Sequence, residues 1–160
     1  MIWIVQRVGK PQLYRGGIWF SPLDEDNLFR LDRYEALHSD KKYYVAQLNI
    51  KKPFIFHVQG EEMDFPIELY AYLKKEDPDV ISDMIDEKCN IDEFAYMDVY
   101  EESPLSPKAQ CYEELLSDIE SESAKILRSK GYDAVFFMYD GIIPEQIFYI
   151  GDERKIKWLT

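Results

Sequence analysis

Four polar side chains lie where runs of apolar residues begin or end. Arg7 closes an apolar run near the N-terminus, Ser21 follows a short second run, and Glu145 and Gln146 open a third one. A planar guanidinium can clamp a phosphate with two hydrogen bonds. A carboxylate can hydrogen-bond a ribose hydroxyl and stabilise an oxocarbenium-like transition state. These residue types therefore favour a nucleotide-sized ligand and glycosyl chemistry.

The residues around Ser21 also have structural interpretations. Trp19 and Phe20 are most simply core residues, although either can stack on a flat ring of a ligand. Ser21 fits the N-cap of a helix that has Pro22 as its first residue and apolar residues at helical spacing as far as Leu37. A hydroxyl at a helix N-terminus can orient a ligand as well, so the two roles are compatible.

Arg7 and Glu145 have structural interpretations too. Arg7 can be an edge-strand residue paired with one of the 31 acidic residues, and Glu145 can be a polar strand start. Arg15 is a second candidate for the arginine role. In a regular strand Gln146 points to the face opposite Glu145. A shift of the strand register by one residue therefore decides whether the carboxylate of Glu145 or the amide of Gln146 faces the ligand.

The elements that must position these residues differ between the ends and the middle of the chain. Apolar runs predict strands over residues 2–8, 18–20, 43–50, 54–56, 133–138, 145–150 and 156–159. Helical spacing predicts helices over residues 67–73, 80–85 and 109–130. Gly131 is expected to end the last helix with a positive φ. The strand that carries Glu145 is expected at an edge of the sheet.

This distribution of strands and helices predicts the α+β class rather than alternating βαβ units. A chain of 160 residues is long enough for one domain with a sizeable core, so a single domain over residues 1–160 is expected. The acidic middle, residues 61–107, is a possible helical insertion. A hydrophobic content of 46% excludes a disordered chain.

The net charge of -12 disfavours a nucleic-acid backbone as the main ligand, because phosphates need a basic surface. It favours solubility, or docking on a basic partner. His38 and His57 have no companions at catalytic or metal-ligand spacing, and Cys89 and Cys111 form no metal motif, so no metal site is predicted.

The N-terminal residues lack a basic region followed by a long apolar core, so neither a signal peptide nor a membrane span is predicted. The expected protein is cytoplasmic, with both cysteines reduced.

Four short motifs, in this order, resemble those of ADP-ribosyltransferase domains in phage polyvalent proteins and in bacterial effectors and toxins. They are Gly16-Gly17-Ile18-Trp19-Phe20-Ser21, Leu48-Asn49-Ile50-Lys51-Lys52-Pro53, Gly131-Tyr132-Asp133 and Glu145-Gln146-Ile147-Phe148. The resemblance implies split mixed and antiparallel β-sheets around an NAD cleft, with flanking helices.

The resemblance also assigns roles, with NAD as the co-substrate. Arg7 holds a phosphate of NAD, and Ser21 shapes the nicotinamide pocket together with Trp19 and Phe20. Glu145 bonds the nicotinamide ribose and assists the loss of nicotinamide. The implied activity is mono-ADP-ribosylation of a macromolecular target, a protein or a nucleic acid.

The chain departs from the family pattern at two positions. Ile143 stands two residues before Glu145, where a second acid is expected, and Gln146 is a rival for the catalytic position. An amide there implies the alternative function, a catalytically silent, acidic relative that docks on a basic or nucleic-acid-binding partner. A small toxin or antitoxin-like protein with another fold is a third hypothesis.

Overall fold

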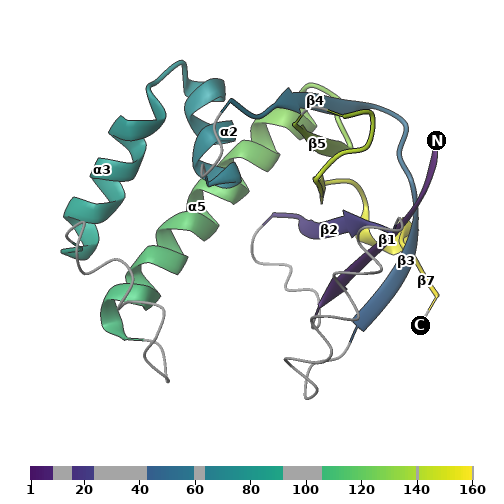
Figure 1. Cartoon of the computed structure of the whole chain (residues 1–160), viewed down its shortest axis with the longest axis horizontal. Coiled ribbons are helices and arrows are strands. Elements are labelled where there is room, and N and C mark those ends of the chain that lie inside the picture. The colour runs from purple at the N-terminus through teal and green to yellow at the C-terminus, as the bar shows by residue number, and fades with distance from the viewer. Residues whose placement is uncertain (9–15, 24–42, 60–63, 92–105, 140, 160) are drawn as a thin grey trace. The chain divides into compact units, whose positions relative to one another are not determined.

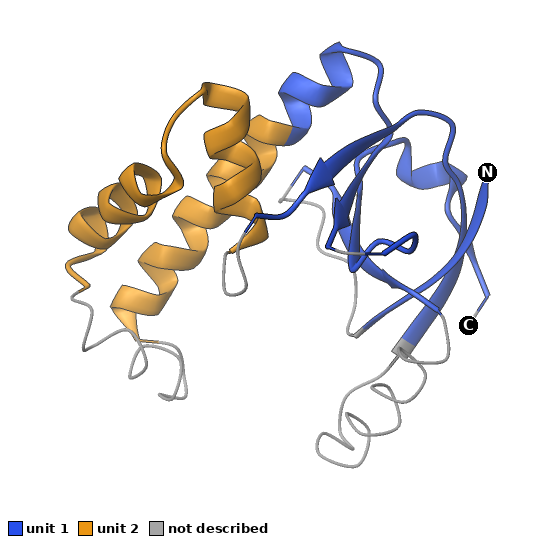
Figure 2. Ribbon diagram, turned by 45° about the horizontal axis from the view of Figure 1, so that its top comes forward, with its two compact units in different colours: residues 1–59, 124–160 blue, residues 60–123 orange. Residues whose placement is uncertain are grey.

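The computed structural model describes residues 1–8, 16–23, 43–59, 64–91, 106–139 and 141–159. These residues form three α-helices and one mixed sheet of seven strands (Figure 1). The α+β class predicted from the sequence is confirmed. The chain divides into two compact units (Figure 2), unit 1 with residues 1–59 and 124–160, and unit 2 with residues 60–123. The insertion expected over residues 61–107 stays a prediction.

The whole sheet belongs to unit 1, and its strand order is β4-β5-β6-β2-β1-β3-β7. The strands are β1 (Ile2–Val8), β2 (Ile18–Pro22), β3 (Tyr43–Asn49), β4 (Pro53–His57), β5 (Ala134–Met138), β6 (Gln146–Tyr149) and β7 (Lys157–Trp158). All neighbours are antiparallel except β4 and β5. The helices lie in the connection between these two parallel strands, which needs a crossover.

β2 connects the two halves of this sheet. Its residues 18–20 pair with β6, and its last two residues, Ser21 and Pro22, pair with β1. Pro22 has no N–H to donate, so the next hydrogen bond to β1 comes from Leu23, whose backbone N–H donates to the carbonyl of Ile4 at 2.9 Å. One short strand therefore fixes β6 and β1 on its two sides.

Two expectations for this region are wrong. Ser21 does not cap a helix, because Ser21 and Pro22 continue β2, where pairing with β1 overrides the local capping preference. Neither β1, which carries Arg7, nor β6 lies at an edge, since each has a strand on both sides. The edge strands are β4 and β7. The helix expected after Ser21 lies among residues 24–42, outside the described residues.

Asp133, in the Gly131-Tyr132-Asp133 motif, forms hydrogen bonds that connect three strands. The Asp133 carboxylate accepts hydrogen bonds from the backbone N–H groups of Lys51, at 2.7 Å, and Lys52, at 2.9 Å. The Asp133 carbonyl accepts from the N–H of Ile150 at 3.0 Å. Gly131 has the expected positive φ of 87°. This one turn therefore aligns the β3–β4 connection with the start of β5 and the end of β6.

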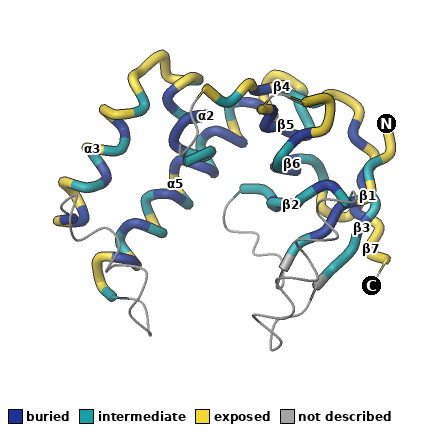
Figure 3. The backbone as a smooth tube through the Cα atoms, viewed as in Figure 1, coloured by how far each residue is buried: buried dark blue, intermediate teal, exposed yellow. Residues whose placement is uncertain are grey.

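One face of the sheet holds a core to which β1, β2, β3, β5 and β6 contribute, and where a strand gives more than one residue these alternate, as the two-residue repeat of a strand requires. Figure 3 colours the buried residues dark blue, and β5 is buried along its whole length. The members of this core are Val5, Ile18, Phe20, Ala46, Leu48, Ile50, Ala134, Phe136, Met138, Ile147, Tyr149 and Ile156. On the opposite face a second group of aromatic rings surrounds Phe137, which is fully buried.

Unit 2 is built from α2 (Phe65–Lys74), α3 (Pro78–Cys89) and the first part of α5 (Pro107–Ser129). The helices expected over 67–73, 80–85 and 109–130 are thus confirmed: α2 and α3 extend beyond both expected ends, and α5 starts two residues earlier and ends one residue earlier than expected. Asp77 caps α3 by accepting from the N–H of Asp79 at 2.9 Å. Residues of these three helices, together with Ile91, form the core of unit 2: Ile67, Ala71, Ile81, Ile85, Cys89, Ile91, Ala109, Tyr112, Leu116 and Ile119. No described helix has the length and apolar character that crossing a membrane requires.

A disulfide joins Cys89 at the end of α3 to Cys111 near the start of α5. The expectation of two reduced cysteines is therefore wrong for this structure. The sequence holds no signal for the pairing, because a sequence separation of 22 says nothing about the proximity of the two cysteines. The helix packing supplies that proximity, with a Cα–Cα separation of 5.6 Å.

Gly17 offers a direct test of the β2–β6 contact. A Cβ atom at Gly17 would lie 2.6 Å from the carbonyl oxygen of Tyr149 and 2.7 Å from the ring of Phe148. Because the backbone of β6 cannot move without shifting the sheet, we expect Gly17→Ala to lower the free energy of unfolding by about 2 kcal/mol. Urea unfolding followed by circular dichroism measures this change.

The matched control is Gly141→Ala. A Cβ there finds its nearest neighbours at 3.9 Å, an ordinary contact distance, and Gly141 is exposed. Equal stability of both variants would contradict the close approach of Gly17 to β6.

Candidate functional site

Ser21 and Gln146 lie side by side where β2 passes from one half of the sheet to the other. Residue pairing between β2 and β6 runs through Phe20 opposite Ile147, so Ser21 is next to Gln146. The side-chain amide of Gln146 donates from Nε2 to the Ser21 hydroxyl oxygen at 3.2 Å. Both side chains are half-buried. This contact joins two of the sequence-predicted site residues, 125 positions apart in the chain.

A third polar side chain continues this line on β1. Gln6 pairs with Ser21 and is only 5% exposed. Residues directly opposite each other on neighbouring strands point to the same face. Gln6, Ser21 and Gln146 therefore form one line across three strands, which we call the polar row. Neighbouring strands are spaced by about 4.8 Å, so the polar row spans roughly 10 Å.

Trp19 borders the polar row, because it lies two residues before Ser21 and so on the same face of β2. Its indole stacks against Phe148, with ring centroids 4.5 Å apart, and against Phe137 at 5.2 Å. The indole N–H is buried and has no hydrogen-bond partner among the described residues. Phe20 points to the other face, where it is buried in the core near Trp158.

Glu145 precedes β6 by one residue and is half-buried. Its backbone N–H donates to the carbonyl of Phe137 at 2.8 Å, although Phe137 already pairs with Gln146. Two residues of one strand thus oppose a single residue of the next, which is the arrangement of a β-bulge. A bulge interrupts the alternation of a strand, so Glu145 and Gln146 need not point to opposite faces.

Arg7 follows Gln6 on β1 and pairs with Tyr44 on β3. Alternation along β1 places Arg7 on the face of Val5, opposite the face of Gln6. The structure thus brings together the strands of Arg7, Ser21 and Glu145, and it puts Ser21 and Gln146 in direct contact. Arg7 is therefore next to Gln6 in sequence but does not lie on the face of the polar row. Its rival Arg15 lies outside the described residues.

Gln6 was missed by the sequence analysis. The available signal was a glutamine directly after the apolar run Ile2-Trp3-Ile4-Val5 in the same predicted strand, a position where a polar group needs hydrogen-bond partners once it is buried. The pairing of Gln6 with Ser21 could not be read from the sequence, because it depends on β2 continuing to Pro22.

The charge of the chain is very unevenly divided between the two units. Unit 1 contains 15 of the 19 basic residues and 11 of the 31 acidic ones, which gives it a formal charge of +4. Unit 2 then carries -16. The negative charge that disfavours a nucleic-acid backbone as a ligand therefore belongs to unit 2 and not to the unit that holds the polar row.

The described residues contain no group of three or more histidine, cysteine, aspartate or glutamate side chains that could hold a metal ion. His57 is exposed on β4, and both cysteines are in the disulfide. His38 lies outside the described residues.

No protein-family model, curated protein or solved structure matches this chain.

The contact between Ser21 and Gln146 can be tested with a double-mutant cycle. We expect Ser21→Ala and Gln146→Ala to show a coupling energy of about 1 kcal/mol in urea unfolding, since each removes one partner of a partly buried hydrogen bond. The control cycle combines Ser21→Ala with Gln110→Ala, which changes an exposed residue of α5 in unit 2. Coupling within error of zero in both cycles would show that the two side chains are not in contact.

Proposed function

We propose that this chain is a mono-ADP-ribosyltransferase that uses NAD to modify a macromolecular target, a protein or a nucleic acid. One observation carries the proposal: β1, β2 and β6 are consecutive strands of the sheet. Residues from opposite ends of the sequence, Ser21 on one side and Glu145 and Gln146 on the other, therefore come to one junction. The resemblance of the four sequence motifs, two of which lie at β2 and β6, supports the same activity.

In this proposal NAD lies at the junction, with its nicotinamide ribose over the polar row. The hydroxyl of Ser21 and the amide of Gln146 bond polar groups of the nicotinamide ribose half, and Trp19 provides a flat apolar wall. Arg7, the residue after Gln6 on β1, points to the opposite face of the sheet, so it does not contact a ligand that lies over the polar row. The positive charge of unit 1 favours such a ligand.

Glu145 supplies the carboxylate that assists the loss of nicotinamide. The bond between ribose C1′ and the nicotinamide nitrogen breaks, and nicotinamide leaves as a neutral molecule with the bonding electron pair. A carboxylate close to the ribose stabilises the positive charge that develops on C1′ and its ring oxygen. A nucleophile of the target then attacks C1′ and releases its proton. The bulge beside Phe137 gives Glu145 a position next to Gln146, where this interaction is geometrically feasible.

A second candidate function is a catalytically silent, acidic relative that docks on a basic or nucleic-acid-binding partner. The specific observation in its favour is the Gln146–Ser21 hydrogen bond, because the side chain in contact with the serine is an amide and carries no charge. The charge of -16 on unit 2 supports a basic partner. In this function the polar row is structural, and transfer of ADP-ribose does not occur.

Two single-atom exchanges separate these functions. We expect Glu145→Gln to lower both nicotinamide release and transfer of labelled ADP-ribose from NAD to lysate macromolecules by about 10²-fold or more, because the stabilising charge is lost. The matched control is Glu114→Gln, the same exchange at an exposed position of α5, which should leave both rates unchanged.

The reciprocal variant is Gln146→Glu. If the wild-type chain is inactive and Gln146→Glu gains nicotinamide release, then Gln146 occupies the catalytic position and the silent relative is the correct function. If millimolar NAD leaves the melting temperature of the wild-type chain unchanged while a salt-sensitive complex with a basic protein forms, the transferase proposal is wrong. A melting temperature raised by several degrees counts against the silent relative.

A further inference from the structure

A pocket of about 280 Å³ lies in unit 1, at the ends of β2 and β6 that are remote from the polar row. Its walls include Gly16, Gly17, Arg128, Tyr149, Gly151 and Glu153. Ile18 pairs with Tyr149 at this end of the two strands, while Ser21 contacts Gln146 at the other. Three residues of strand separate the two places, a distance of roughly 10 Å.

The glycines give this pocket walls of backbone rather than of side chains. A Cβ atom at Gly151 would lie 2.8 Å from the Tyr149 hydroxyl oxygen, and one at Gly17 would lie 2.6 Å from the Tyr149 carbonyl oxygen. Gly16 has a φ of 73°, which other residues rarely adopt. Side chains at these positions would strain the backbone or collide with β6, so the glycines are what allow the walls to approach so closely.

Arg128, from the last turn of α5, is the positive charge of the pocket. Its Nε donates to the carbonyl of Ile150 at 2.5 Å, and its Nη2 donates to the carbonyl of Gly16. These two bonds hold the guanidinium across the ends of β6 and β2. A guanidinium has five N–H donors, so further donors remain for a ligand. Burial lowers the pKa of Arg128, but a guanidinium still remains charged at neutral pH.

Arg128 forms no ion pair with any carboxylate of the described residues, and its hydrogen bonds go to neutral carbonyl groups. Glu153 lines the same pocket, yet it does not pair with Arg128. Arg128 is exposed, so water solvates part of its guanidinium, and an anionic ligand in the pocket would supply the charged partner that the described residues do not provide.

Tyr149 adds no competing charge. Its hydroxyl donates to the carbonyl of Asp152 at 3.0 Å, and its pKa is raised by burial first and then by the nearby carboxylates of Asp133 and Asp152. The phenol is therefore neutral at physiological pH. Asp152 is itself held away from the pocket by a two-point ion pair with Arg154, at 3.0 and 3.1 Å.

We propose that this pocket is a binding site for a small oxyanion group, a phosphate or a carboxylate, held by Arg128 between the glycine backbone segments. Glu153 weakens the site by repulsion and restricts it to a single small anionic group. The site is separate from the polar row, so its existence does not depend on the proposed transferase activity.

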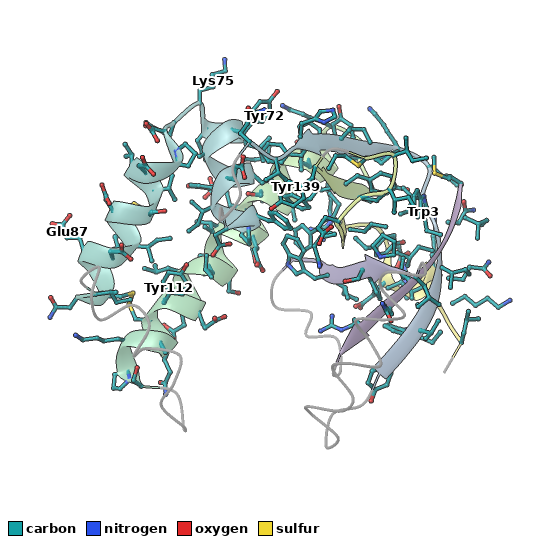
Figure 4. All side chains as sticks on the ribbon, viewed as in Figure 1. Trp3, Tyr72, Lys75, Glu87, Tyr112 and Tyr139 are labelled. Atoms are coloured by element: carbon teal, nitrogen blue, oxygen red, sulfur yellow. A yellow bond between two sulfur atoms is a disulfide. The ribbon has the colours of Figure 1, made fainter. Side chains whose placement is uncertain are left out.

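The test is isothermal titration of the full chain with inorganic phosphate and, in parallel, with acetate. We expect saturable binding of phosphate at roughly millimolar concentration, the range of a single partly exposed charged site. Glu153→Gln removes the nearby negative charge from an exposed side chain and should tighten phosphate binding about fivefold. The control Glu87→Gln changes an exposed acid of α3 in unit 2 (Figure 4) and should leave binding unchanged.

Arg128→Lys keeps the charge but loses the planar fork, and it should weaken binding severalfold if the variant folds. If it does not fold, Glu153→Gln decides alone. Binding of phosphate without acetate assigns the site to phosphate groups, and binding of both assigns it to oxyanions in general. No saturable binding of either anion, or equal affinities for the wild type, Glu153→Gln and Glu87→Gln, overturns the proposal.

Discussion

The pairing of β2 with two different partners is the constraint on which the rest of unit 1 depends. Residues 18–20 of β2 bond β6, and Ser21 and Pro22 bond β1. β2 is the strand that hydrogen-bonds to both halves of the sheet, β4-β5-β6 on one side and β1-β3-β7 on the other. Because the change of partner occurs between Phe20 and Ser21, it sets both the position of the polar row and the face on which it lies. The candidate site is thus a direct consequence of how the sheet is joined.

Asp133 provides the second fixed point of that sheet. Its carboxylate accepts hydrogen bonds from two consecutive N–H groups in the β3–β4 turn, and its carbonyl accepts one from the end of β6. Lys52 adds a contact over the Tyr132 ring at 4.6 Å. The motifs at residues 48–53 and 131–133, far apart in sequence, therefore serve one structural purpose. They align β6, which carries Gln146, with the rest of the sheet.

Local patterns in the sequence predicted most elements, since β1, β3, β5 and all three helices follow from periodicity and residue type. What depends on distant partners could not be predicted. Ser21 has the local signals of a helix cap, yet it lies in β2 because β1 is there to pair with it. Likewise, Cys89 and Cys111 are joined only because α3 packs against α5, and the bulge at Glu145 depends on the register with Phe137. Of the site, the sequence predicted Ser21 and Gln146 as members but not Gln6 as their neighbour.

The central claim is that the polar row at the junction of β1, β2 and β6 binds NAD. Nuclear magnetic resonance of the ¹⁵N-labelled chain tests this most directly, because the side-chain amides of Gln6 and Gln146 and the indole N–H of Trp19 each give a signal. Our account predicts that all three signals shift together and saturably as NAD is added, and that Ser21→Ala weakens the response. Shifts confined to other parts of the chain, or no shift at millimolar NAD, would contradict it.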